Sequence, residues 1–292
     1  MARREAPTQT VQLDIHDHDR DKAGLTYVYP VVSRRARGVS IGVNLNPNNA
    51  CNWRCVYCQV PGLTFGRAPE IDLRLLEREL ESMLAHALDP RWMETHVAEG
   101  ARRLNDVALS GNGEPTSSRQ LPLVVECIER VLRRFELVGR LPVVLITNGS
   151  LVHQAHVRSA LTQLARLGGE VWFKVDAVRE EDRERINGAR VGWARAASNL
   201  ELCARTCPTW VQTMVVDFDG STMPPLAERA YVDALRSLGE RGVRLRGVLL
   251  YGMARTSHQP QAPRLKCLPA AELEALGQRL RAATGLDVRV SV

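Results

Sequence analysis

The sequence lacks any apolar run of about 18 residues, the length that a helix needs to cross a membrane. It also lacks the short apolar core of a secretion signal near its first residues. We therefore expect a cytoplasmic protein without a membrane partner, in which the thiols stay reduced. No repeat of fixed period and no low-complexity linker is present, so a repeat architecture is not predicted.

The bulk composition is that of an ordinary globular protein, with 45% hydrophobic and 25% charged residues. A length of 292 residues suits an α/β barrel, which often forms one unit of about 250 residues. The formal net charge of +6 favours an anionic partner such as RNA, or an anionic substrate. Because arginine is spread along the whole chain, this charge alone does not identify nucleic-acid binding.

Residues 1–37 are polar and show no apolar periodicity, so we expect an N-terminal polar arm there. Residues 38–292 are expected to form the core domain with a C-terminal extension. The arm contains alternating histidine and aspartate at residues 16–19, which either bind a metal or, as we favour, lie in solvent.

Strands alternate with helices from residue 38 onward. Strands are predicted at 39–45, 106–110, 143–146, 171–176, 209–216, 245–250 and 288–290. Helices are predicted at 72–88, 121–135, 152–167, 193–205, 225–241 and 270–283. This alternation predicts parallel strands joined by crossover helices. The expected fold class is α/β, a partial (β/α)6 TIM-type barrel of parallel strands.

Three cysteines, Cys51, Cys55 and Cys58, follow the first predicted strand with the spacing CxxxCxxC. Such a loop can supply three thiolate ligands to a metal cluster and leave one position open for chemistry. No fourth ligand lies close by, since the next candidates are His86 and Cys127. Structural zinc is the alternative, but it usually needs a second cysteine pair within about 20 residues. The spacing therefore favours an iron–sulfur cluster.

The ends of other predicted strands are also polar. The second strand is followed by the turn GNGEP at residues 111–115, where glycine lets the backbone approach a ligand closely. The third strand ends at Thr147 and Asn148, and the fourth carries Lys174 and Asp176. The last two share one strand face, so an ion pair between them is an equally good interpretation. Because α/β barrels build their sites at the carboxyl ends of strands, we expect these groups at one mouth.

Together these features resemble the radical S-adenosylmethionine (SAM) enzymes. The CxxxCxxC loop, with Tyr57 before its last cysteine, is similar to the cluster motif of that family. The GNGEP turn is similar to its glycine-glycine-glutamate motif, although asparagine here splits the glycine pair. That departure leaves open which backbone amide meets the ligand. The resemblance covers roughly residues 38–255 and implies a partial barrel with enzymatic activity.

The resemblance implies two cofactors, a [4Fe–4S] cluster and SAM. The three cysteines would hold three irons, and the fourth iron would bind the amino and carboxylate groups of SAM. One electron from the reduced cluster would give methionine and a 5′-deoxyadenosyl radical that takes hydrogen from a substrate. No catalytic residue is assigned. The residues that the resemblance places around SAM are Tyr57, Gly111, Asn112, Gly113, Glu114, Thr147, Asn148, Lys174 and Asp176.

Within the superfamily, the segments SGNGEPT, ITNGS and FKVDA resemble small iron–sulfur oxidoreductases related to wyosine-type tRNA-modifying enzymes. This implies tRNA as a candidate substrate and a reducing protein such as a flavodoxin or ferredoxin as electron donor. An activase that acts on a glycyl-radical protein is one alternative, and a non-catalytic iron–sulfur or zinc protein is another. Cys203, Cys207 and Cys267 could bind an auxiliary cluster, but the four-residue spacing of the first two favours helix packing.

Overall fold

The computed structural model describes residue 13, residues 24–33 and residues 38–292. Most of the predicted arm, including the histidines and aspartates at 16–19, therefore lies outside the described residues. Within the described part, an eight-stranded sheet has the order β1-β2-β5-β6-β7-β8-β10-β12. Its strands are Val28–Ser33 (β1), Gly38–Val43 (β2), Leu104–Leu109 (β5), Val143–Thr147 (β6), Glu170–Lys174 (β7), Thr209–Val215 (β8), Gly247–Gly252 (β10) and Val288–Ser291 (β12).

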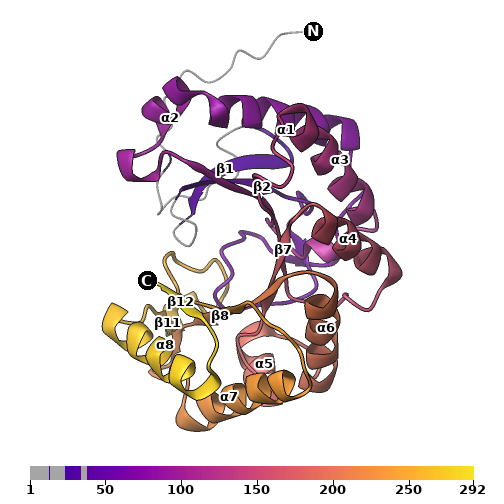
Figure 1. The fold of residues 1–292 in the computed structure, drawn as a ribbon. Helices are drawn as coiled ribbons and strands as arrows, with labels where there is room; N and C mark the ends of the chain where they lie inside the picture. Colours follow the sequence, from indigo (N-terminus) through magenta and orange to yellow (C-terminus); the bar gives the residue numbers. More distant parts are fainter. Residues whose placement is uncertain (1–12, 14–23, 34–37) are drawn as a thin grey trace.

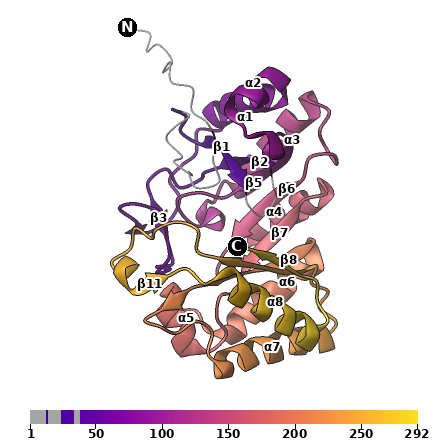
Figure 2. The ribbon, with the colours of Figure 1, turned by 90° about the vertical axis from the view of Figure 1, so that its left-hand side faces the viewer.

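Strand β1 is antiparallel to β2, and the other neighbouring pairs of this sheet are parallel. Short strands in the loops form two further pairs, Ala50–Cys51 (β3) with Thr64–Phe65 (β4) and Asp217–Phe218 (β9) with Leu265–Lys266 (β11). Figures 1 and 2 show the sheet curled, with the helices on its outer side. The helices are Leu73–Leu88 (α1), Pro90–His96 (α2), Leu121–Arg134 (α3), Ala155–Arg166 (α4), Glu180–Asn187 (α5), Trp193–Thr206 (α6), Pro225–Glu240 (α7) and Ala270–Thr284 (α8).

The predicted partial barrel of parallel strands is confirmed, and each predicted strand and helix is present with ends shifted by a few residues. Strand β1 differs from the expectation, because Val28–Ser33 was expected to belong to the polar arm. The buried carboxylate of Glu79 in α1 fixes the start of this strand. It accepts backbone N–H groups of Thr26, Tyr27 and Val28 at 2.9, 2.8 and 3.2 Å. This acceptor lies 51 to 53 residues away in the sequence, so no local pattern reveals it.

The structure also contains helices α2 and α5, which the sequence did not predict. The residues that α5 buries are Arg183 and Asn187, which are not apolar, so the helix has no hydrophobic periodicity to detect. Among the described residues, no helix combines the length and the apolar character that a bilayer crossing requires.

The two faces of the sheet bury different side chains. The outer face and the helices share one large apolar core, to which α3 contributes Val124, Ile128 and Val131. The inner face holds a smaller group, which we call the interior cluster and which consists of Ala108, Val144, Trp172, Trp210 and Leu249. The interior cluster fills the barrel below the carboxyl ends of the strands, and the space above it is left to the polar strand ends.

Candidate active site at the carboxyl ends of the strands

The polar strand ends converge on one cavity of about 300 Å³. This volume lies at the lower end of the range that small-molecule sites occupy. Thr147 and Asp176 do not line the cavity but are buried directly beside residues that do. The expected site residues that line it are Cys51, Cys55, Tyr57, Cys58, Gly111, Asn112, Gly113, Glu114, Asn148 and Lys174.

The cysteine loop is held from two sides. The backbone N–H groups of Arg54 and Val56 donate to the carbonyls of Asn187 and Ile186 at the end of α5, both at 2.9 Å. On the other side, the Ser257 hydroxyl donates to the Val56 carbonyl at 2.7 Å. The first two contacts use carbonyls that a helix end leaves without intrahelical partners. The loop conformation therefore depends on α5 and on the segment after β10, neither of which the cysteine spacing indicates.

Burial shapes the chemistry of the thiols. Burial raises the pKa of Cys51 to about 12 and that of Cys55 to about 11. Both thiols are therefore protonated at neutral pH when no metal is bound, and metal binding must release these protons. Among the described residues, no three His, Cys, Asp or Glu side chains lie close enough together to hold a metal ion.

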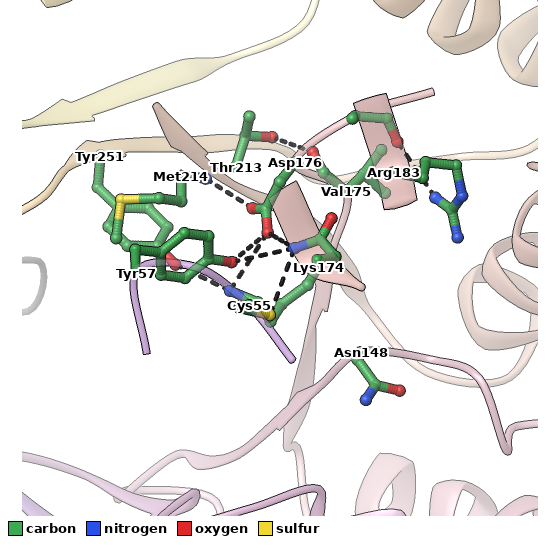
Figure 3. A network of polar contacts seen from close by, with 12 residues as sticks. Cys55, Tyr57, Asn148, Lys174, Val175, Asp176, Arg183, Thr213, Met214 and Tyr251 are labelled. Carbon is green, nitrogen blue, oxygen red and sulfur yellow. Dashed lines mark hydrogen bonds and ion pairs between the residues drawn. The ribbon is translucent and has the colours of Figure 1, made fainter. Parts of the chain in front are cut away.

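A buried network connects Tyr57 with strands β7 and β8 (Figure 3). Asp176 Oδ2 accepts from the Tyr57 hydroxyl and from Asn187 Nδ2, the latter at 2.7 Å. Asp176 Oδ1 accepts from the backbone N–H of Met214 at 2.8 Å. The ion pair between Lys174 and Asp176 is also present, with 3.8 Å between Nζ and Oδ2. Asp176 is thus engaged within the protein, whereas Lys174 both joins this network and lines the cavity.

The network reaches the sulfur of Cys55. Asn187 Nδ2 lies 3.4 Å from Cys55 Sγ, so the side-chain amide of Asn187 donates to the Cys55 sulfur. Lys174 Nζ donates to the Tyr251 hydroxyl at 3.0 Å and lies 5.0 Å from the centre of the Tyr57 ring. Burial alone would lower the pKa of Lys174, but the charge of Asp176 raises it above its ordinary value. Lys174 is therefore a cation at neutral pH.

The glycines of the GNGEP turn pack against the cysteine loop. A Cβ atom on Gly113 would lie 2.0 Å from the carbonyl oxygen of Ala50, the residue before the first cysteine. A Cβ atom on Gly111 would lie 2.3 Å from Asn44 Oδ1, and Gly111 has a φ of +150°. That same Oδ1 accepts the backbone N–H of Asn112 at 3.0 Å. Glycine is required at both positions because the turn and the loop approach each other closely.

Glu114 is buried and has four hydrogen-bond donors. Its Oε1 accepts the Thr116 backbone N–H at 3.1 Å, the Thr116 hydroxyl at 2.6 Å and the Thr147 hydroxyl at 2.6 Å. Its Oε2 accepts the backbone N–H of Asn148 at 2.7 Å. Burial raises the pKa of Glu114, and the bonds from Thr116, Thr147 and Asn148 oppose that rise. The carboxylate thus ties the loop after β5 to the end of β6, and Oε2 keeps one open acceptor position.

The remaining cysteines are not gathered around a site. Cys203 and Cys207 are buried in the main apolar core, whereas Cys267 is exposed and donates to the Met253 carbonyl at 2.8 Å. Arg255, which follows β10, also lines the cavity, and its Nη1 lies 3.4 Å from Gln59 Oε1.

Sequence reasoning missed Asn187 and Ser257, which hold the cysteine loop. Gln212, a polar residue near the end of the fifth predicted strand, does line the cavity. Asn187 precedes Gly188, and an Asn-Gly pair is a recognisable helix-end signal. Ser257 carries no comparable local signal, because its position beside the loop depends on the closing of the barrel.

Comparison with known proteins gives a consistent result. The family model described as "Radical SAM superfamily" matches residues 45–230, which contain the cysteine loop, the GNGEP turn and strands β5 to β8. The UPF0026 protein slr1464 of Synechocystis sp. is 25% identical over 287 residues, which are 90% of this chain and 95% of that protein.

Two solved structures show the same fold at low sequence identity. A radical SAM methyltransferase from Sphaerobacter thermophilus superposes with a TM-score of 0.61 and 16% identity, over 87% of this chain and 66% of that chain. The structure of TYW1 with a lysine-pyruvate adduct bound gives a TM-score of 0.52 and 15% identity, over 85% of this chain and 74% of that chain. These likenesses support the fold of the partial barrel.

Proposed function

This chain belongs to the radical SAM superfamily, and we propose that Cys51, Cys55 and Cys58 hold its [4Fe–4S] cluster beside a SAM site in the described cavity. The protein is a radical SAM enzyme, and its cofactors are the cluster and SAM. When bound and reduced, the cluster supplies the electron that splits SAM into methionine and a 5′-deoxyadenosyl radical. One observation carries the proposal: three sulfurs and the GNGE turn, more than 50 residues apart, line one cavity.

The residues of the cavity fit these cofactors. Gly111 and Gly113 line the cavity without side chains, so we propose that their backbone groups approach the amino and carboxylate groups of SAM. We propose that Glu114 positions this turn and offers its open Oε2 acceptor to the SAM amine. Thr147 and Asn148 hold Glu114 in position through their hydrogen bonds to it. Tyr57 and Lys174 form the wall of the cavity on the β7 side. The buried Asp176 holds that wall in place.

The partners and the domain limits extend the proposal. We propose residues 38–292 as the catalytic core, preceded by a segment at 1–37 whose strand β1 joins the edge of the same sheet. A flavodoxin- or ferredoxin-like protein is the proposed electron donor.

The net charge of +6 supports tRNA as the substrate class, because a basic protein attracts the phosphate backbone. Binding of tRNA should then weaken steeply as salt rises, which a filter-binding titration at several salt concentrations measures. A protein substrate is the alternative outcome.

The function is tested by anaerobic loading with iron and sulfide, reduction with dithionite and addition of SAM. We expect about four iron and four sulfide per chain. Liquid chromatography with mass spectrometry should then detect 5′-deoxyadenosine and methionine in equal amounts, and only when both reductant and SAM are present. A loaded cluster that never yields 5′-deoxyadenosine would contradict the proposed reaction.

Asn187→Leu should make the reduction potential of the cluster more negative. The Asn187 amide lies 3.4 Å from Cys55 Sγ, and a hydrogen bond to a ligating sulfur stabilises the more negative, reduced state. A bond to a charged group contributes at least about 1.5 kcal/mol, which corresponds to about 65 mV for one electron. Redox titration followed by electron paramagnetic resonance measures the change. Tyr57→Phe is the matched control, because it removes a donor to Asp176 but none to sulfur. Equal potentials in Asn187→Leu and wild type would refute this role.

A further inference from the structure

Gln212 has a buried amide group that none of the contacts described above uses. The side chain is 1% exposed and lines the cavity from strand β8. Among the residues that the structure describes, its Nε2 has no hydrogen-bond partner. Buried amide donors in native proteins nearly always find a partner, and an exception calls for an explanation. A ligand that enters the cavity would supply the missing acceptor.

The position of Gln212 separates it from the cysteine loop. Along β8, Gln212 lies two residues from both Trp210 and Met214, so these three side chains face the same side of the sheet. Trp210 belongs to the interior cluster, whereas Met214 packs in the apolar group around Tyr57 and Val56. Gln212 therefore lies one level deeper in the barrel than the residues that contact the loop.

Lys174 is the lateral neighbour of Gln212 at this level. The two residues are paired in the register of β7 and β8, and both line the cavity. Neighbouring strands lie about 4.8 Å apart, so the ammonium and the amide can donate to the two oxygens of one anion. Figure 3 shows Lys174 beside Asp176, Tyr57 and Tyr251. The ammonium donates to the Tyr251 hydroxyl at 3.0 Å and keeps donor capacity for a further acceptor.

Acidic side chains near this level are already engaged within the protein. Glu114 accepts four donors, and Asp176 accepts three besides its ion pair with Lys174. Asp106, which also lines the cavity, accepts the Ser40 hydroxyl at 3.0 Å. Ala108 and Trp172 of the interior cluster line the wall of the cavity next to these donors, together with Ile146. The level thus offers donors and one cation beside an apolar wall.

We propose that Gln212 and Lys174 bind a carboxylate of the second substrate, whose aliphatic part packs against the apolar wall formed by Ala108, Ile146 and Trp172. This inference rests on the proposed function, since it places the substrate below the SAM site. The same chemistry has two sources, because SAM also carries a carboxylate. The two possibilities are distinguished by whether the Gln212 amide controls the affinity for the second substrate or the affinity for SAM.

The probe is isovalerate, a small carboxylate with an aliphatic body, and its neutral isostere isovaleramide is the comparison. Calorimetric titrations use the full-length protein with its cluster loaded and with saturating SAM. Loss of one charge-assisted hydrogen bond corresponds to about a tenfold change in Kd. We expect Gln212→Met to weaken isovalerate about tenfold, and Gln212→Glu to weaken it further by charge repulsion. Isovaleramide should bind wild type at least about tenfold more weakly than isovalerate.

SAM affinity, measured in the same variants, should stay within about twofold of wild type. Gln163→Met on the outer helix α4 is the control and should change neither affinity, because Gln163 does not line the cavity. The proposal is overturned if isovalerate does not bind wild type, or if both Gln212 variants bind it as wild type does. It is also overturned if SAM affinity falls in step with isovalerate affinity, which would assign the amide to SAM. Iron and sulfide analysis of each preparation shows separately whether the cluster proposal has failed.

Discussion

Cys55→Ala is expected to give a folded protein whose iron and sulfide content falls from about four of each per chain to less than one. SAM cleavage should fall below detection, because without the cluster no electron reaches the sulfonium. Cys55 lines the cavity together with the other two thiols, and its Sγ accepts from Asn187. The variant should fold because α5 and Ser257 hold the loop through backbone atoms. Iron and sulfide analysis, the visible spectrum and 5′-deoxyadenosine release measure the outcome.

Cys267→Ala is the matched control for this loss. Cys267 is exposed and does not line the cavity, so its removal should leave both the iron content and SAM cleavage unchanged. The same variant tests the auxiliary-cluster interpretation of the distal cysteines, since a second cluster would lose iron with it. A full cluster and normal cleavage in Cys55→Ala would show that the loop has been given the wrong role.

Most of the fold could be predicted because its signals are local. Each parallel strand is a short apolar run, and each long helix carries an apolar stripe such as Val124, Ile128 and Val131 of α3. Strand β1 could not be predicted, because its start depends on the carboxylate of Glu79 in a distant helix. Helix α5 could not be predicted either, because it buries an arginine and an asparagine in place of apolar residues.

The candidate site divides in the same way. The cysteine loop and the GNGEP turn are chemical patterns within single segments, so the sequence alone predicts them as site residues, and the structure brings them to one cavity. The contacts of Asn187 and Gln212 depend on how β8 and the end of α5 lie beside the loop once the sheet has curled. The ion pair of Lys174 with Asp176, left open by the sequence, exists together with the lining role of Lys174. Long-range geometry decided each of these points.

Glu114→Ala should keep the cluster but weaken SAM binding at least about tenfold and lower the free energy of unfolding by about 3–5 kcal/mol. The substitution removes the acceptor for four hydrogen bonds of 2.6–3.1 Å. Two come from Thr116 in the turn after β5, and one each comes from Thr147 and Asn148 at the end of β6. The two hydroxyls can rotate toward other acceptors, whereas the two backbone N–H groups cannot, and each buried donor left without a partner costs about 1–3 kcal/mol. The cysteine loop is held elsewhere, so iron content should stay near the wild-type value. Urea denaturation and SAM titration of the loaded protein measure the two effects.

Glu114→Gln separates the two contributions. Its amide oxygen can still accept from the hydroxyls of Thr116 and Thr147, but its NH₂ group would meet the backbone N–H of Asn148, which is also a donor. The bond from the Asn148 backbone is then lost, while the Thr147 bond and the side-chain volume are kept. We therefore expect an intermediate loss of stability together with most of the loss in SAM affinity. If both variants lose stability but bind SAM as wild type does, Glu114 only holds the two strands together, and the SAM amine must find its acceptor among the backbone carbonyls of the turn.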